Sequence, residues 1–476
     1  FLLTKINKFG TCTMAIQCGG MNEDGALDIE IDPTGGLLIC GYFSTTMNIL
    51  GTEIYSAGYS DAFVASISFD GILNWVKVCG GTTGDNFGSV AADKDGNVYV
   101  SGTISSTVNF AGSTFPGYGE AVATAARYNS TGTEIWMRKS INVSVSAYSF
   151  GTEVEVDKNQ NVYMGGIYYG DINIGPFELF DGNPHMFFTK LSNVGVPVWA
   201  VDENGFYGAF AWSMDADKNG NLYIAGQFQY EMTFGGFTIS TGGFNTNAYV
   251  AKIRNVDGSV LWINQVECAD NSFFHDIQVV SRDLLLVCGG YETSASYDDL
   301  ILYNGDVEVD GMIVKIDPAT GAGLQTFSMG SDAFTTPQEI GYDKLGNILL
   351  TGGFKESMTL GETFTVTSYG GYDCFYTKIT GLLPREMEEE DLTTEEPSGF
   401  TIFPNPAVDI ITVNYNIAEN ASTFLEIANA TGEIVNTESK ELIPGINSIS
   451  ININELPAGI YFVKINDHAE QFVKIK

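Results

Sequence analysis

The chain has 476 residues, 44% of them hydrophobic, and a formal net charge of −36. That charge excludes nucleic acid as a partner, because a phosphate backbone is bound by clustered Lys and Arg. Apolar runs in the sequence stay well short of the roughly 20 residues that a spanning helix needs, so we do not expect the chain to span a membrane.

A short phrase recurs six times, at intervals of 60 to 64 residues. Its clearest copy begins at Asp93 and reads Asp-Lys-Asp-Gly-Asn-Val-Tyr, and the other copies begin at Asp32, Asp157, Asp217, Val280 and Asp343. Residues before the phrase alternate with a period of two, and β-forming residues follow it. This pattern predicts two strands joined by a tight turn, for which Asp, Gly and Asn are suited. The Asp93 copy lacks the downstream Glu of a calcium loop, so we interpret it as a β-turn.

A second phrase follows in each unit and pairs a turn glycine with a tryptophan four residues later. The pairs are Gly71/Trp75, Gly132/Trp136, Gly195/Trp199 and Gly258/Trp262, with Met14 and Gln325 replacing the tryptophan in two further places. These residues predict a third and a fourth strand. Units of about 60 residues with four antiparallel strands are typical of propeller blades. We therefore predict an all-β chain in which residues 1–381 form a β-propeller of six or seven four-stranded blades. Because Phe1 falls in mid-blade, we expect residues upstream of it to be missing.

Polar side chains recur at two positions in the first strand of each unit, four and two residues before the turn. If this strand is innermost, they line or approach the axial channel. Seven are carboxylates, which predicts either a hydrated polar channel, a Ca²⁺ site through oxygen ligands, or acid–base groups. The candidate metal ligands are Asp28, Glu30, Glu153, Glu155, Asp215, Asp276 and Glu339. No cofactor is otherwise indicated.

Connections between the second and third strands are long and rich in aromatic residues among Gly, Ser and Thr. All should emerge on one face of the propeller, where aromatic platforms suit sugar or protein surfaces. The alternative is that most of them cap the blades as core residues. The candidate ligand-binding residues are Tyr55, Tyr59, Tyr118, Tyr168, Tyr169 and Tyr230.

The repeats end near Gly381, and residues 382–399 contain seven acids against Arg385 alone. Such a segment repels itself and lacks core-forming residues, so we predict an extended acidic linker. Residues 400–476 then alternate as several short strands. About 77 residues of this kind suggest a small immunoglobulin-like β-sandwich.

The tail resembles a known family closely. Its Phe403-Pro404-Asn405-Pro406 opening, the Ala-Thr-Gly at Gly432, the Leu-Pro-Ala-Gly-Ile-Tyr-Phe-Val-Lys block and the basic end are similar to the type A sorting domain of the type IX secretion system of Bacteroidota. The matching positions are Phe403, Pro404, Asn405, Pro406, Gly432, Leu456, Pro457, Gly459, Ile460, Tyr461, Lys464, Lys474 and Lys476. The resemblance implies recognition by the outer-membrane translocon and its shuttle protein, removal of the tail by a sorting peptidase, and secretion or attachment at the cell surface.

The repeats resemble, less tightly, a bacterial β-propeller repeat family with Asp-x-x-Gly-Asn-x-Tyr and Asp-Ala-Phe-Val motifs, which adds a fold and no activity. The histidines His185, His275 and His468 match no catalytic motif, and no nucleophile elbow or phosphate loop is present. We therefore expect an exported binding or adhesion protein with a glycan or protein ligand. The alternatives are an extracellular carbohydrate-active enzyme that uses the channel carboxylates, and a structural component of the cell surface or secretion apparatus.

Overall fold

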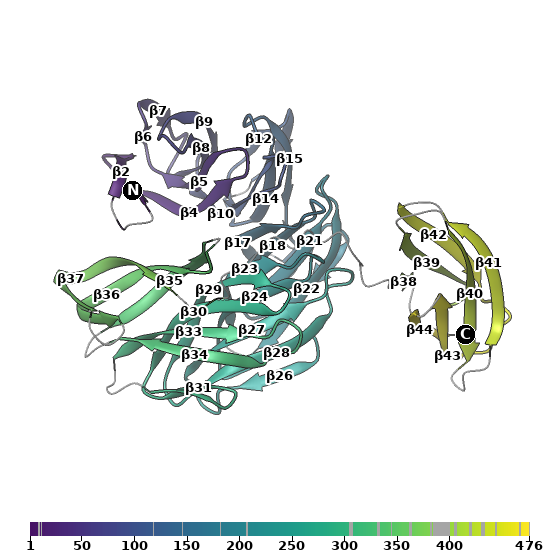
Figure 1. Cartoon of the computed structure of the whole chain (residues 1–476). Coiled ribbons are helices and arrows are strands. Elements are labelled where there is room, and N and C mark those ends of the chain that lie inside the picture. Colours follow the sequence, from purple (N-terminus) through teal and green to yellow (C-terminus); the bar gives the residue numbers. More distant parts are fainter. Residues whose placement is uncertain are drawn as a thin grey trace. The chain divides into compact units, whose positions relative to one another are not determined.

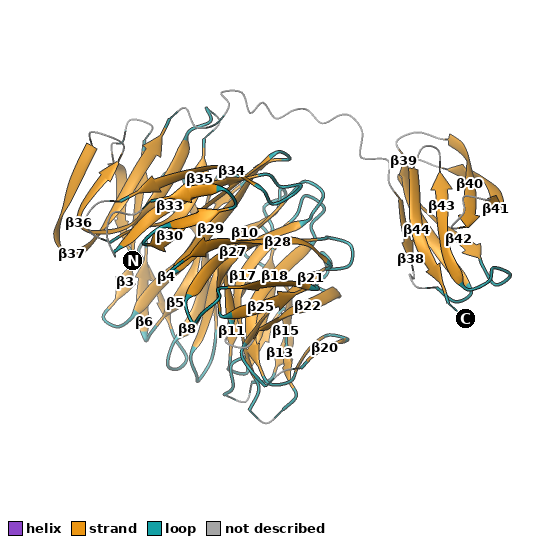
Figure 2. Ribbon diagram, turned by 90° about the horizontal axis from the view of Figure 1, so that it is seen from below, coloured by secondary structure: helices purple, strands orange, loops and turns teal. Residues whose placement is uncertain are grey.

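The computed structural model describes the chain except residues 8, 9, 11, 118, 145, 181, 206, 207, 304–307, 331–333, 344, 361–363, 381, 382, 384–399, 404–406, 418–420, 430–433, 443, 444, 466, 467 and 476. The chain divides into two compact units, Phe1–Arg385 and Glu386–Lys476. Every regular element of the described residues is a β-strand (Figure 2). The predicted linker falls almost wholly outside the described residues.

The larger unit is a β-propeller, and its sheets follow one another in sequence order, from purple to green in Figure 1. The first two contain β4 (Asp24–Asp32), β5 (Gly36–Phe43), β8 (Asp61–Ser68) and β9 (Leu73–Cys79), then β10 (Asp85–Ala92), β11 (Val98–Ile104), β14 (Ala123–Tyr128) and β15 (Glu134–Lys139). The third and fourth begin with β17 (Tyr148–Val156), β18 (Val162–Tyr169), β21 (His185–Leu191) and β22 (Pro197–Gly205), and with β23 (Ala209–Ala216), β24 (Leu222–Gln229), β27 (Thr246–Ile253) and β28 (Val260–Cys268).

The fifth sheet contains β29 (Ser272–Ser281), β30 (Leu284–Glu292), β33 (Val309–Ile316) and β34 (Gly323–Met329). The sixth has three strands, β35 (Thr335–Tyr342), β36 (Ile348–Leu360) and β37 (Phe364–Ile379), and a separate pair contains β1 (Leu2–Ile6) and β2 (Cys12–Gln17). The first strand of each sheet, β4, β10, β17, β23, β29 or β35, is here called its inner strand.

The repeated turn is a β-turn, as expected. The Gly96 amide donates to the Asp93 carbonyl at 2.9 Å. The Asp93 carboxylate accepts the Asn97 amide at 2.9 Å and the Tyr99 hydroxyl at 3.0 Å. The carboxylate therefore satisfies local donors, which explains why Asp, Asn and Tyr recur together in the phrase.

The long connections are not simple loops, because each forms a hairpin of its own. The hairpins are β6 (Thr46–Ile49) with β7 (Thr52–Tyr55), β12 (Val108–Phe110) with β13 (Ser113–Phe115), β19 (Ile172–Ile174) with β20 (Phe177–Leu179), β25 (Glu231–Phe234) with β26 (Phe237–Ser240), and β31 (Ala295–Tyr297) with β32 (Leu300–Leu302). Some extend the sheet of the preceding unit: Glu203 on β22 pairs with Phe234 on β25. Short strands β3 (Gly19–Gly20) and β16 (Ile141–Asn142) pair with β6 and β19 in the same way.

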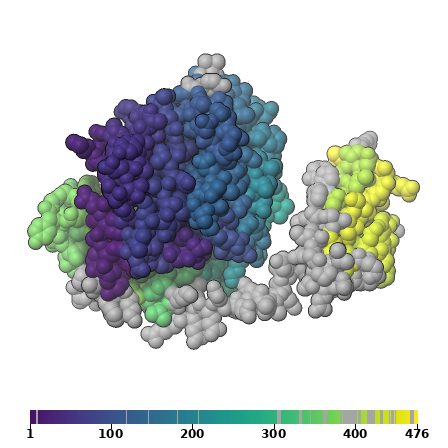
Figure 3. Space-filling view, turned by 90° about the horizontal axis from the view of Figure 1, so that it is seen from above, coloured from purple at the N-terminus to yellow at the C-terminus, as the bar shows by residue number. Residues whose placement is uncertain are grey.

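Four units are linked to the next one through a tryptophan. The indole Nε1 of Trp136 donates to the Asn193 carbonyl of the following unit at 3.0 Å. A Cβ placed on Gly195 would lie 2.8 Å from the Trp136 ring, so only glycine leaves room for the indole there. Trp75, Trp199 and Trp262 repeat this contact with Ser130, Asn255 and Pro318 at 3.0, 2.8 and 3.2 Å. The glycine and tryptophan that alternate in the sequence therefore meet between units, not within one (Figure 3 shows successive segments side by side).

The inner strand of the first unit differs from the others in burial. Ile29 on β4 is 50% exposed, whereas the equivalent Val90, Val154, Met214, Ile277 and Ile340 are only 3–6% exposed. In those five units a preceding sheet covers this position. The choice between six and seven blades stays a prediction.

The smaller unit is a β-sandwich, as predicted. One sheet contains β38 (Phe400–Phe403), β39 (Ile410–Ile417) and β42 (Gly445–Asn452), and the other contains β41 (Ile434–Leu442), β40 (Ala421–Asn429), β43 (Gly459–Ile465) and β44 (His468–Lys474). Side chains from both sheets, including Val413, Ile427, Val463 and Phe472, form a common core.

Candidate functional site: the channel and its aromatic rim

A β-bulge interrupts every inner strand just before its first predicted polar position. In β23, for example, Ala211 and Ser213 pair with successive residues of β24, which leaves Trp212 as the extra residue. The other bulged residues are Leu27, Gly88, Thr152, His275 and Gln338. A bulge re-aims the side chains beside it and frees backbone groups from the ladder. The bulge therefore sets the direction in which the side chains after it point. The sequence pattern did not predict the bulge.

The structure brings the seven predicted carboxylates together from different units. Burial raises the pKa of Glu153 well above its usual value, and nearby Asp28, Asp276 and Glu339 raise it further. The pKa of Glu155 is raised in the same way by burial and then by Asp215 and Glu30. The carboxylates thus form two tiers. The tier four residues before the turn contains Asp28, Glu153, Asp276 and Glu339, and the tier two residues before it contains Glu30, Glu155 and Asp215.

Several of these carboxylates accept backbone amides from the next inner strand. Asp28 accepts the Val90 amide at 2.8 Å, and Asp276 accepts the Ile340 amide at 2.8 Å. Asp215 accepts the Val279 amide at 2.6 Å. These carboxylates of both tiers therefore join neighbouring units.

Two serines occupy the same position of the repeat, four residues before the turn, and take the same role. Ser89 accepts the Val154 amide at 3.2 Å, and Ser213 accepts the Ile277 amide at 3.3 Å. Ser213 also donates to Asp276 at 2.6 Å. The repeat alignment placed both serines among the polar positions of the inner strands, and the structure shows that they bind the next inner strand.

Burial and like-charge neighbours raise the pKa values of these carboxyl groups, well above the usual value for Glu153 and Glu155, so a protonated carboxyl here can supply a hydroxyl donor as well as a carbonyl acceptor. Burial raises the pKa of Asp215 to about 6 although it accepts several hydrogen bonds. Among the described residues, no group of three or more His, Cys, Asp or Glu side chains is placed to hold a metal ion. Calcium binding by the seven carboxylates stays a prediction.

The predicted aromatic residues of the connections have different surroundings. Tyr55 is 65% and Tyr59 is 81% exposed, and Tyr230 stacks on Phe244 with ring centroids 5.6 Å apart. Tyr168 corrects the expectation of a surface platform: it is fully buried on β18. Its hydroxyl donates to the Asp202 carboxylate at 2.5 Å.

Tyr169 is half-buried and stacks on Tyr148 at 5.2 Å. Tyr118 lies outside the described residues.

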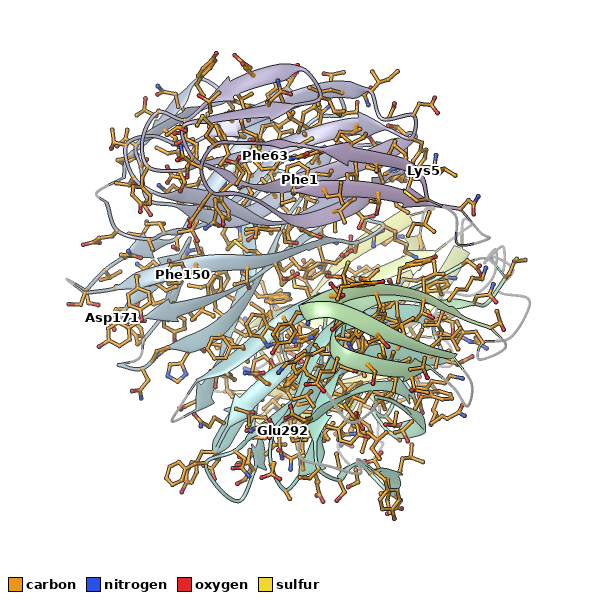
Figure 4. All side chains as sticks on the ribbon, turned by 90° about the vertical axis from the view of Figure 1, so that its left-hand side faces the viewer. Phe1, Lys5, Phe63, Phe150, Asp171 and Glu292 are labelled. Atoms are coloured by element: carbon orange, nitrogen blue, oxygen red, sulfur yellow. The ribbon has the colours of Figure 1, made fainter. Side chains whose placement is uncertain are left out.

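A further group of aromatic residues lies where three consecutive inner strands begin, and we call it the aromatic crescent. It consists of Tyr148, Phe150, Phe210, Trp212, Phe273 and His275. The inner strands begin on the face where the aromatic connections emerge, since Phe210 pairs with Gln227 at the end of β24. Figure 4 shows Phe150 on the β17 ribbon. Sequence reasoning missed this group because it lies in strands, whereas only the connections were searched for aromatic residues.

Histidines outside the crescent play structural parts. His185 is buried, with its Nδ1 atom 3.3 Å from a Glu203 carboxylate oxygen that is equally buried. His468 begins the last strand of the sandwich. No helix of the described residues is long and apolar enough to cross a bilayer.

In the sandwich, the predicted signal positions divide between core and surface. Tyr461 is buried, stacks on Phe472 at 5.6 Å and donates to the Pro457 carbonyl at 2.9 Å. Lys474 is also buried, and its ammonium donates to the Ile475 carbonyl at 3.0 Å.

Ile460 and Lys464 are exposed on β43. Leu456 and Gly459 are half-buried beside them, and the Phe403 backbone pairs with Thr412. Pro404, Asn405, Pro406, Gly432 and Lys476 lie outside the described residues.

Comparisons with solved structures return distant likenesses to the chain. One is to the quinohemoprotein alcohol dehydrogenase ADHIIG of Pseudomonas putida HK5, at 13% identity and a TM-score of 0.33, covering 70% of this chain and 54% of that one. Another is to latent dimeric PorU of Porphyromonas gingivalis, at 10% identity and a TM-score of 0.15, covering 68% of this chain and 32% of that one. The chain thus spans about half of the first structure and a third of the second.

A comparison with curated protein sequences gives no significant match. A family model for the secretion system C-terminal sorting domain matches residues 401–475. This range coincides with the β-sandwich and with the motifs on β38 and β43 described above. Residues 401–475 are therefore a type IX secretion C-terminal sorting domain, which directs the propeller before it across the outer membrane to the cell surface or beyond.

Proposed function

We propose that the exported propeller is a binding or adhesion module at the cell surface. The observation that supports this proposal is the gathering of exposed aromatic side chains on one face of the propeller. Tyr55, Tyr59 and Phe244 are each at least 65% exposed there. Aromatic faces beside small polar residues suit sugar rings, since they contact the apolar face of the ring while neighbouring polar groups bind its hydroxyls.

The purified chain is expected to be retained on at least one member of a panel of polysaccharides and host glycans. Retention is measured by affinity electrophoresis, with and without Ca²⁺. Dependence on calcium would implicate the carboxylate tiers as ligands of that ion. A chain that is retained on no glycan, with or without the ion, contradicts the proposed function.

Export by the sorting domain gives a separate expectation. Removing residues 401–476 should reduce the surface and medium fractions of the protein to background, because the translocon, its shuttle protein and the sorting peptidase would then lack their recognition element. Cell fractionation with immunoblotting measures this. The full chain with Tyr59→Ala serves as control, since Tyr59 lies in the other unit, and normal export of the truncated chain would contradict the expectation.

Carbohydrate-active catalysis is the second candidate, and the raised pKa values of Glu153 and Glu155 favour it. A protonated carboxyl group can act as general acid toward a glycosidic oxygen while another carboxylate assists. Release of reducing ends from a retained polysaccharide, abolished by Glu153→Gln, would favour the enzyme over the binding module.

A further inference from the structure

We propose that the aromatic crescent is the primary subsite of the propeller and that it takes a neutral sugar residue. This inference rests on the proposed binding function and names its location: the mouth of the axial channel across the third, fourth and fifth units, not the outer connections. It also names the ligand class, an uncharged carbohydrate.

Comparison between repeats supports a ligand-binding role for the crescent. Aromatic residues that the fold needs recur in several units and are buried, as Tyr99, Tyr163 and Tyr223 are. Crescent residues occur in three units only. Three residues before the first channel position, the remaining units carry Gly25, Asn86 and Thr336. One residue before it they carry Leu27, Gly88 and Gln338, as the third unit carries Thr152, whereas Tyr148 lies five residues before it, where the sixth unit carries Phe334. The aromatic choice is therefore not required to build a blade.

Exposure supports the same conclusion. Trp212 is 46%, Phe150 is 39% and Phe210 is 37% exposed. All five tryptophans are described, and Trp212 alone among them is exposed. An exposed tryptophan at a bulge gains little from folding, because much of its apolar surface stays in water. Its presence is explained if a ligand covers it.

The rings are arranged in pairs, one pair on each of the three strands. Phe210 and Trp212 are nearly parallel, with centroids 5.7 Å apart and an interplanar angle of 15°. Phe150 leans on Tyr148 at 5.4 Å, and Phe273 lies 4.8 Å from the His275 ring. The fourth and fifth units are tied together directly beneath the rings by the Ser213–Asp276 hydrogen bond. Rings held in pairs on rigid strands lose little side-chain entropy on binding.

The polar groups that follow the crescent residues in the chain suit an uncharged ligand. Ser213 follows Trp212 in the chain, Asp276 follows His275, and Glu153 lies three residues after Phe150. Their hydroxyl and carboxyl groups can donate to and accept from sugar hydroxyls.

Charge argues against an anionic ligand. Strands β17, β23 and β29 contain no Lys or Arg. Burial lowers the pKa of His275, so its imidazole is neutral at pH 7. Sulfated, sialylated or phosphorylated ligands would find no cation in these strands and would meet a chain of net charge −36.

The test uses the full chain and four probes: mannan, dextran and a soluble β-glucan as neutral polysaccharides, and heparin as a polyanion. Trp212→Ala and Phe210→Ala are compared with Tyr55→Ala and Tyr59→Ala, which remove exposed rings of the outer connections and so test the rival location on the same face. Phe69→Ala, which removes a 42% exposed ring at the turn between β8 and β9, is the matched control. Affinity electrophoresis gives the apparent Kd. Titration of intrinsic fluorescence gives a second readout, because Trp212 is the exposed tryptophan.

We expect each crescent variant to bind the retained neutral polysaccharide about tenfold more weakly or worse, and the control Phe69→Ala to bind within about twofold of the unaltered chain. Tyr55→Ala and Tyr59→Ala should weaken binding less than the crescent variants do. The fluorescence change should disappear in Trp212→Ala. Near-ultraviolet circular dichroism checks the fold, and Trp212→Gln replaces Trp212→Ala if the alanine variant does not fold.

Four outcomes would overturn the inference. If the outer variants lose binding and the crescent variants keep it, the site is wrong and the proposed function stands. If heparin alone is retained, the neutral ligand class is wrong. If none of the four probes is retained but the wider glycan panel is, the ligand assignment fails alone. If nothing in either set is retained, the proposed function fails with it.

Discussion

Trp136→Ala is expected to lower the free energy of unfolding of the propeller by about 3–5 kcal/mol. The indole is only 7% exposed and packs over Gly195 of the next unit. Its loss leaves a cavity between two units and removes the donor of the 3.0 Å hydrogen bond to the Asn193 carbonyl. Denaturant titration followed by tryptophan fluorescence measures the change for the propeller alone, because all five tryptophans lie in Phe1–Arg385.

Two further variants make this expectation specific. Trp212→Ala removes an exposed ring and should change the free energy of unfolding by no more than about 0.5 kcal/mol. Gly195→Ala changes the other partner of this contact and should also destabilise the propeller. The φ of +76° at Gly195 disfavours a side chain, and an added Cβ would lie 2.8 Å from the indole. Equal effects of Trp136→Ala and Trp212→Ala would show that the indole does not fasten the units.

Relative to the unaltered chain at the same pH, Asp215→Asn is expected to be more stable at pH 8 than at pH 4 by about 2 kcal/mol. The pKa of Asp215 is raised from an ordinary 3.8 to about 6 in the folded state. A raised folded pKa means that the stability contribution is fully present below pH 3.8 and is lost as the pH rises through about 6. Asparagine resembles the protonated acid in charge, so the variant should not lose this contribution.

The measurement is the free energy of unfolding of both chains at intervals from pH 4 to pH 8. The amide can weaken the hydrogen bonds to Val279 and Gln278 by an amount that does not depend on pH. The test is therefore how the difference in free energy of unfolding between the two chains varies with pH. Asp70→Asn, at an exposed turn between β8 and β9, is the matched control and should give a flat difference. A flat difference for Asp215→Asn as well would mean that the carboxyl is ionised in the folded channel throughout this range.

Periodicity carried most of the fold prediction. The alternation before each turn placed Asp28, Glu153 and Asp276 on one side of their strands correctly, because a strand has a fixed period of two. The bulge at Trp212 was not predicted, because a bulge depends on how two backbones pair and is marked by no fixed residue in the sequence. The hairpins in the connections escaped as well. Runs as short as Val108–Phe110 are too brief for periodicity to distinguish from loop.

Contacts between repeats could not be predicted from the sequence either. The spacing of Gly195 and Trp199 predicted two strands and no contact, whereas the glycine meets Trp136 of the unit before it. Tyr168 was assigned to a connection because its strand was expected to end earlier, whereas β18 runs to Tyr169. The crescent shows the same limit: its residues are distant in the chain, and only the pairing of inner strands around the axis places them on one rim.

The tryptophan–glycine contact has a consequence for how such a ring changes over generations. Four joints use the same pair, with the indole on one unit and the glycine on the next, and the joint before them has the same geometry with Met14 lying against Gly71. An in-frame duplication or deletion of one whole unit therefore recreates an equivalent joint at the seam without any compensating mutation. Such units are interchangeable, because each carries both the glycine that receives the preceding indole and the tryptophan that contacts the next unit. Ring size can drift by recombination, while the residues at each mouth remain free to diversify unit by unit.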